Sequence, residues 1–148
     1  MKLFQIEEPD GSPVDPDAPG IAIGIDIGDP EAEVAVAVGG NAVVLADRDG
    51  FALDLSVPAP AASAEDWQML FEGARLRAER SLGQPVTHAV LAVASMPDAA
   101  FAAQLSSAAA ATGLTLLRIL ARDGSGAEPA PLAAAVLAED LAPRPGAP

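Results

Sequence analysis

One eight-residue stretch of strict alternation constrains the fold of this chain more than any other feature. Ile21 to Gly28 carries isoleucine at every odd position and Ala, Gly, Asp and Gly at the even positions. Because successive side chains of a strand point to opposite faces, the pattern predicts a strand with one branched face toward a core. The other face bears small residues and one carboxylate, which indicates that another part of the molecule approaches it closely.

The next segments predict a meander. Glu33 to Val38 alternates again, and Gly39-Gly40-Asn41 is typical of a hairpin turn into a strand over Ala42 to Ala46. Phe51 to Val57 is expected to form a further short strand or a continuation of the third, before the prolines that follow it.

Helical and strand patterns then alternate. Ser63, with Asp66 three positions on, predicts a helix start by a variant of the capping box. The apolar stripe of this helix consists of Trp67, Leu70, Phe71, Ala74 and Ala78. The elements expected after it are a strand over Val86 to Ala94, a helix from Pro97-Asp98 to Thr112, a strand over Leu114 to Leu120 and a helix over Pro131 to Leu141.

A meander followed by strand–helix–strand steps predicts a mixed sheet with helices packed against it, because such steps make right-handed parallel crossovers. The fold class is therefore α/β, of ribonuclease-H-like or actin-like type. Residues 20–142 are expected to form one domain. Residues 1–19 and 143–148, rich in Pro, Gly and Asp, are expected to be flexible segments.

Composition excludes several functions. The chain has no cysteine and one histidine, His88, so thiolate and multi-histidine metal sites are ruled out. Eight basic residues against 21 acidic ones give a net charge of -13, which opposes nucleic acid and anionic membranes as partners. No apolar stretch is long enough for a bilayer and no signal pattern opens the chain, so a cytoplasmic location is expected.

Three segments carry a resemblance to one family. Ile23-Gly24-Ile25-Asp26-Ile27-Gly28 resembles the first phosphate motif of DnaK-type heat-shock chaperones, roughly IGIDLGTT. The segment from Gly83 to Val90 is similar to the chaperone stretch GEPVTDAV, and Thr112 to Ile119 is similar to AGLNVLRI. The resemblance covers about Gly20 to Leu141. It implies the first lobe of the ATPase domain, with strand order 3-2-1-4-5.

The resemblance also implies which residues would face a nucleotide. Asp26 matches the family's metal-facing aspartate, Gly28 lies in the phosphate turn, and Glu128 could correspond to a metal-facing glutamate. The hydroxyl-bearing turn residues of the family are replaced by Asp29 and Pro30, which add negative charge and remove a backbone donor. Because Lys2 is the only lysine, the family's phosphate lysine has no counterpart.

These departures predict a degenerate site and a chain that does not hydrolyse ATP on its own, with no cofactor. The alternatives are a residual sensor or weak ATPase that binds ATP or ADP with Mg²⁺, and a lobe completed by a second polypeptide. Asp26 with Asp29 or Glu31 could also bind a divalent cation. A metal-dependent nuclease is disfavoured, because no further acid follows the fourth strand until Asp98 and the charge opposes DNA.

The main hypothesis is a non-catalytic protein-binding or assembly factor that docks on a protein partner or on a second copy. Its motivation is the small-residue face of the first strand and the alanine-rich last helix, which a missing second lobe would leave bare. The candidate interface residues are Leu132, Val136 and Leu137, together with Trp67. Trp67 is interpreted first as a core residue of the helix stripe and alternatively as an exposed interface anchor. His88 is interpreted as structural, and Ser95 as a helix cap.

Overall fold

The alternating segments form the meander that the sequence predicts. A computed structural model describes residues 21–28, 31–45, 55–59, 62–121 and 130–142 of the chain. β1 (Ile21–Asp26), β2 (Glu33–Val38) and β3 (Asn41–Leu45) pair antiparallel in succession. Gly39 and Gly40 make the turn between β2 and β3 with φ of 61° and 86°, a backbone region that glycine enters without steric cost.

The second half of the chain adds two parallel strands through helical crossovers. The order is α1 (Ala64–Leu82), β4 (Val86–Val93), α2 (Ala99–Ala111), β5 (Thr115–Ala121) and α3 (Ala130–Leu141). β4 pairs parallel with β1 and with β5, so the sheet order is β3-β2-β1-β4-β5. The predicted strand order 3-2-1-4-5 and the α/β class of ribonuclease-H-like and actin-like folds are confirmed.

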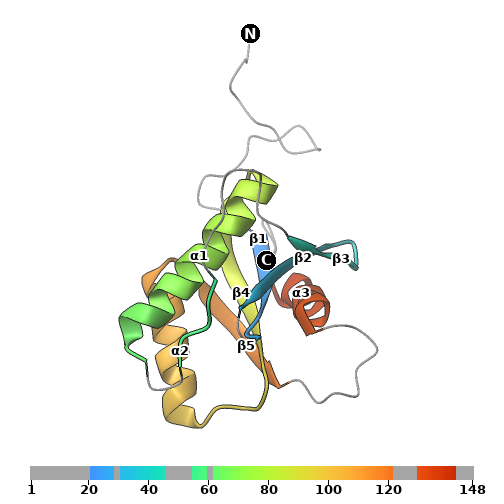
Figure 1. Ribbon diagram of the computed structural model, residues 1–148. Coiled ribbons are helices and arrows are strands. Elements are labelled where there is room, and N and C mark those ends of the chain that lie inside the picture. Colours follow the sequence, from blue (N-terminus) through green and yellow to red (C-terminus); the bar gives the residue numbers. More distant parts are fainter. Residues whose placement is uncertain (1–20, 29–30, 46–54, 60–61, 122–129, 143–148) are drawn as a thin grey trace, which may run out of the picture.

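Helices cover both faces of the sheet, with α1 and α2 on one side and α3 on the other (Figure 1). The isoleucines of β1 point to the first side, where Ile23 and Ile25 are fully buried among residues of both helices. The predicted stripe of α1 is buried at every position, namely Trp67, Leu70, Phe71, Ala74 and Ala78. The sequence thus assigns the correct face to both elements.

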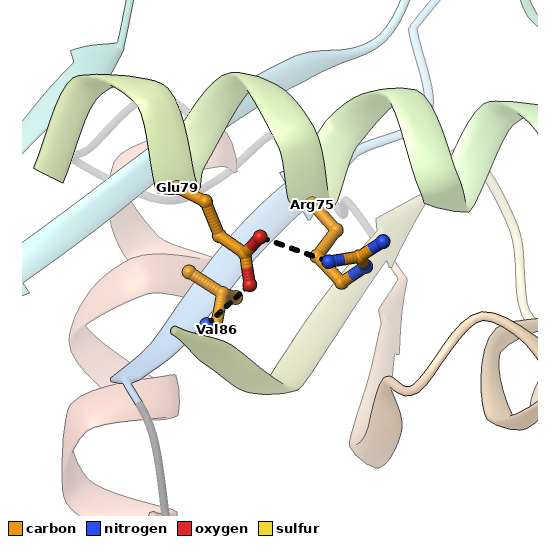
Figure 2. A network of polar contacts seen from close by, with 3 residues as sticks. All are labelled: Arg75, Glu79 and Val86. Carbon is orange, nitrogen blue, oxygen red and sulfur yellow. Dashed lines mark hydrogen bonds and ion pairs between the residues drawn. The ribbon is translucent and has the colours of Figure 1, made fainter. Parts of the chain in front are cut away.

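A carboxylate fastens the end of α1 to the strand that follows it. Glu79 accepts a hydrogen bond from the backbone N–H of Val86 at 2.9 Å and another from Arg75 Nη1 at 2.8 Å (Figure 2). Gly83 ends the helix in the left-handed conformation and donates its N–H to the Glu79 carbonyl. Helix, turn and strand are therefore held by one residue.

Capping agrees with the sequence at α1 and differs at α2. Ser63 caps α1, where its Oγ accepts from the Asp66 N–H at 3.3 Å. The cap of α2 is Asp98, which accepts from the Phe101 N–H at 2.7 Å, and not Ser95 as predicted. Ser95 lies outside the helix because α2 begins at Ala99, after Pro97.

The small-residue face of β1 is not bare, which corrects the expectation drawn from the missing lobe. α3 lies directly on it, and a Cβ built at Gly24 would lie 2.7 Å from the carbonyl carbon of Ala134 and closer still to the Ala135 nitrogen. Ala134, Ala135 and Ala138 are fully buried in this contact. The two alanine- and glycine-rich surfaces cover one another, because small side chains let a helix approach a strand closely.

Several expectations fall partly or wholly outside the described residues. The short strand expected over Phe51 to Val57 appears in its described part only as a bridge between Ser56 and Glu31. The segments 1–19 and 143–148 lie outside the description altogether. Among the described residues, no helix has the length and apolar character needed to cross a bilayer.

Candidate functional site

The end of β1 holds the residues that sequence analysis assigns to a degenerate nucleotide site. Among the described residues, Asp26 is the one charged residue that is buried, with an exposure of 5%. Gly28 donates its N–H to the Asp26 carbonyl at 3.0 Å, and a Cβ at Gly28 would lie 2.8 Å from the Glu31 carbonyl oxygen. The tight turn therefore requires glycine, and it places residue 28 beside the Asp26 carboxylate.

A short segment backs this turn. The N–H of Ala32 donates to the Leu55 carbonyl at 2.9 Å, and Glu31 forms a bridge with Ser56. Leu55 is buried at 1% exposure, so its backbone is fixed against the start of β2. Asp29, Pro30 and Glu128, the other predicted residues, lie outside the described part of the chain. In the described ranges no three acidic or histidine side chains gather in a way that could hold a metal ion.

Trp67 lies in the core rather than at the surface, so it is not an exposed interface anchor. Its exposure is 3%, and its ring packs edge-on to Phe101 with centroids 5.6 Å apart and tilted against Phe71 at 6.5 Å. Its indole Nε1 is buried without a hydrogen-bond partner. The interpretation of Trp67 as a core residue agrees with this position, because its place on the buried stripe of α1 turns it inward.

The three candidate interface residues of α3 are half-buried. Leu132 and Val136 pack with Ala35 and Ala37 of β2, and Leu137 packs on the face formed by β1 and β4. Their contacts are therefore those of a helix lying on its own sheet. These three side chains therefore pack partly against the core and remain partly exposed to solvent.

The exposed apolar side chains gather elsewhere, on the β2–β3 hairpin. Val38 is 72% exposed, Val43 57% and Val44 39%, and the described residues hold two further large apolar side chains of this kind, Met69 and Met96. β3 is an edge strand whose residues Asn41 to Leu45 carry no charge and no proline. Two of the devices that usually protect a sheet edge, charged residues and proline, are therefore absent from β3. Alternation alone did not reveal this exposure, because an edge position depends on the sheet order.

A carboxylate from α3 holds the tip of this hairpin. Glu139 accepts from the N–H groups of Gly39 at 2.6 Å and Gly40 at 2.9 Å. An open depression of about 520 Å³ lies beside this contact and is lined also by Asp140 and Ala142. Sequence analysis missed this tie, because the residues are about a hundred positions apart and no local pattern links them.

His88 lies on β4 opposite Ala22 of β1 and is half-buried. Its Nδ1 lies 2.7 Å from the Thr87 hydroxyl oxygen. Burial lowers the pKa of His88, because desolvation disfavours the charged imidazolium. The surroundings thus favour the neutral ring, in keeping with the structural role that the sequence predicts.

Comparison with known proteins finds a remote likeness among solved structures. No protein-family model matches the chain, and no curated protein matches it either. Among solved structures the chain is similar to the ethanolamine utilization protein EutJ from Carboxydothermus hydrogenoformans, with 19% identity and a TM-score of 0.45. The match covers 73% of this chain and 39% of the EutJ chain, so this chain spans well under half the length of that protein. So distant a likeness does not say what this chain binds.

Proposed function

We propose that this chain is a non-catalytic protein-binding factor, built on a lobe that resembles the first lobe of DnaK-type ATPase domains. The observation that carries the proposal is the uncharged edge strand β3, with Val38, Val43 and Val44 of the β2–β3 hairpin exposed. An edge strand offers a row of backbone donors and acceptors to an extended segment of a partner, and flanking apolar side chains add specificity. The partner class is therefore a protein that contributes a strand.

The turn after β1 supports the non-catalytic part of the proposal. Phosphoryl transfer depends on backbone donors, a basic group and a metal aimed at the phosphates. Here Pro30 lacks a donor, Asp29 adds negative charge, and the single lysine, Lys2, precedes the domain in sequence. Asp26, which the resemblance assigns to the metal, is buried at the end of β1.

A residual nucleotide sensor is the second candidate. The observation in its favour is that Asp26 and Gly28 keep the strand-end position that the resemblance implies, with a backbone turn too tight for a side chain. Such a sensor would bind Mg²⁺ with ATP or ADP at this end of the sheet. Titration calorimetry separates the two candidates. We expect no heat at millimolar Mg-ATP, whereas binding that Asp26→Asn abolishes would contradict the non-catalytic proposal.

The docking edge is tested by charge substitution. Val43→Lys places a charge in the exposed edge strand and is expected to abolish recovery of a defined partner by affinity purification from native cells. Met69→Lys, at a position 70% exposed on α1, is the matched control and is expected to leave recovery unchanged. Equal recovery with both variants, or a strict monomer with no partner recovered at all, would contradict the proposal.

A further inference from the structure

The hairpin turn determines which backbone groups of β3 point away from the sheet. The two-residue turn Gly39–Gly40 closes on the pair Val38 and Asn41. Such a turn ends on a hydrogen-bonded pair, and hydrogen-bonded pairs alternate with non-hydrogen-bonded pairs along an antiparallel ladder. Every second residue of β3, counted from Asn41, therefore directs its N–H and C=O groups to β2. Ala42 and Val44 direct theirs to the outer edge of the described sheet.

These outward groups complement those of a second copy of the same strand. When two β3 strands run antiparallel about a two-fold axis at Val43, Ala42 of each copy lies opposite Val44 of the other. Both of these pairs then exchange N–H···O bonds, and every residue of the strand has a partner. An axis shifted by one residue would align just one of the two outward residues with β3. Val43 meets its own copy in a non-hydrogen-bonded pair, the closer kind, which suits packing of β-branched side chains.

Charge favours a second copy at this edge over the opposite one. Each copy carries a net charge of -13, so most of the surface repels another copy. β3 has no charged side chain, and the register centred on Val43 brings no carboxylate of the strand opposite another. The other edge strand, β5, has the exposed Arg118 as its middle residue. The same pairing there would place two like charges directly opposite one another, which is destabilising.

The helices leave room for this pairing. α3 packs mainly on β1 and β2, on average one and a half strands inward from the β3 edge. In a sheet continued across two copies, the two α3 helices would lie about four strand spacings apart, or about 19 Å. Packed helices need about 8–10 Å between their axes. The edges therefore meet without a collision between these helices.

We propose that two copies of this chain form a homodimer in which their β3 edges pair antiparallel about Val43. The inference rests on the proposed function, because it uses the same edge and names a second copy as the partner that contributes a strand. The contact runs along one strand of five residues. An interface this small gives a weak, reversible dimer that forms as the protein concentration rises.

A charge exchange at position 43 tests the two-fold axis on the full chain. Sedimentation equilibrium over a range of concentrations is expected to show the mass of the unmodified protein rising from monomer to dimer. Val43→Lys and Val43→Asp each place like charges opposite one another and remove the valine contact, so each is expected to weaken the dimer roughly tenfold. An equimolar mixture of the two variants is expected to regain it, because opposite charges then meet across the axis. Met69→Lys, 70% exposed on α1, is the matched control and should dimerise like the unmodified chain.

Amide hydrogen exchange on the unmodified chain tests the same register without any substitution. The N–H groups of Ala42 and Val44 point to the edge, so their exchange is expected to slow as the concentration rises. The N–H of Val43 already faces β2 and serves as the internal control. A dimer that leaves exchange at Ala42 and Val44 unchanged would show that another surface is used. Trp67 emission in urea checks that each variant retains the native core.

Three further outcomes would overturn the inference. They are a monomer at every concentration, a dimer that Val43→Lys does not weaken, and a mixture of the two charge variants that stays monomeric. The proposed function is judged separately, by recovery of a partner from native cells. If the protein is monomeric and Val43→Lys still abolishes recovery of a different protein, the edge is a docking site and the second copy is the wrong occupant. If Val43→Lys changes neither, both proposals fail.

Discussion

Gly24 is where the two layers of the molecule touch through their backbones. A helix that lies this close to a strand leaves no space for a Cβ, because the neighbouring atoms belong to the Ala134–Ala135 peptide and not to a flexible side chain. Glycine in a strand is otherwise unfavourable, since it loses more conformational freedom on folding than other residues. The close approach of α3 explains why the position is glycine.

Gly24→Ala is expected to lower the free energy of unfolding by about 1–3 kcal/mol, because overpacking against backbone outweighs the gain in strand propensity. Urea titration followed by Trp67 emission measures this change. Ala121→Ser adds one side-chain atom at an exposed strand position and is expected to stay within about 0.5 kcal/mol of the wild type. Equal stability of the two variants would mean that α3 does not lie on Gly24.

His88 gives a prediction about pH. Burial lowers its pKa, so the folded state binds fewer protons than the unfolded state between the lowered value and the ordinary value of about 6.5. The associated stability is fully present above the unfolded pKa and is lost as pH falls through this window. Because the chain has one histidine, His88→Gln should flatten the stability profile between about pH 7 and 5, as measured by urea titration at each pH. Parallel profiles would contradict it.

At the scale of elements, the connection from α1 to β4 depends on one carboxylate. Glu79 satisfies the first N–H of the strand and holds the Arg75 guanidinium at the same time, with side-chain exposures of 27% and 23%. Arg75 Nε is buried without a partner, so the guanidinium is already incompletely satisfied. Removing the carboxylate would leave the Val86 N–H unpaired as well.

We therefore expect Glu79→Ala to cost about 1–3 kcal/mol of unfolding free energy, the penalty of an unpaired, partly buried donor. Amide hydrogen exchange at Val86 should accelerate in the same variant. Glu72→Ala, an exposed glutamate of the same helix, is the control and should change neither quantity appreciably. Unchanged exchange at Val86 with Glu79→Ala would argue against the tie shown in Figure 2.

How much the sequence predicts depends on whether a feature is local. The isoleucines of β1 and the stripe of α1 were assigned to the correct faces, because period 2 and period 3.6 directly report burial. The α2 cap was misassigned to Ser95, since both Ser95 and Asp98 can cap and only the start of the helix decides between them. The tie from Glu139 to the hairpin depends on a contact between distant segments, which no local pattern encodes.

At the scale of the whole molecule, one face of the sheet depends on a single helix. Among the described residues, α3 is the helix that covers this face. Ala22, Val90 and Ala92 of the sheet are buried beneath it with Ala134 and Ala138. An apolar face of this extent is not stable in water without its cover. The domain therefore depends on a helix close to the end of the sequence.

Removing residues 130–148 is expected to expose this face and to give a chain that binds a hydrophobic dye and aggregates. Removing only residues 143–148 is the control, and it should leave the cooperative urea transition unchanged. Size-exclusion chromatography with dye binding distinguishes the two. A truncated 1–129 chain that stays monomeric with a cooperative transition would show that the remaining layers suffice.

The shortened ladder between β1 and β2 has a mechanical consequence. β1 is held to β4 along its whole length, and β2 to β3 over five residue pairs, but the seam between these two units has three pairs. A force applied across the sheet would part the seam first and carry the β2–β3 hairpin away intact. The Glu139 carboxylate of α3 accepts hydrogen bonds from the hairpin tip, so it resists this separation together with the three residue pairs.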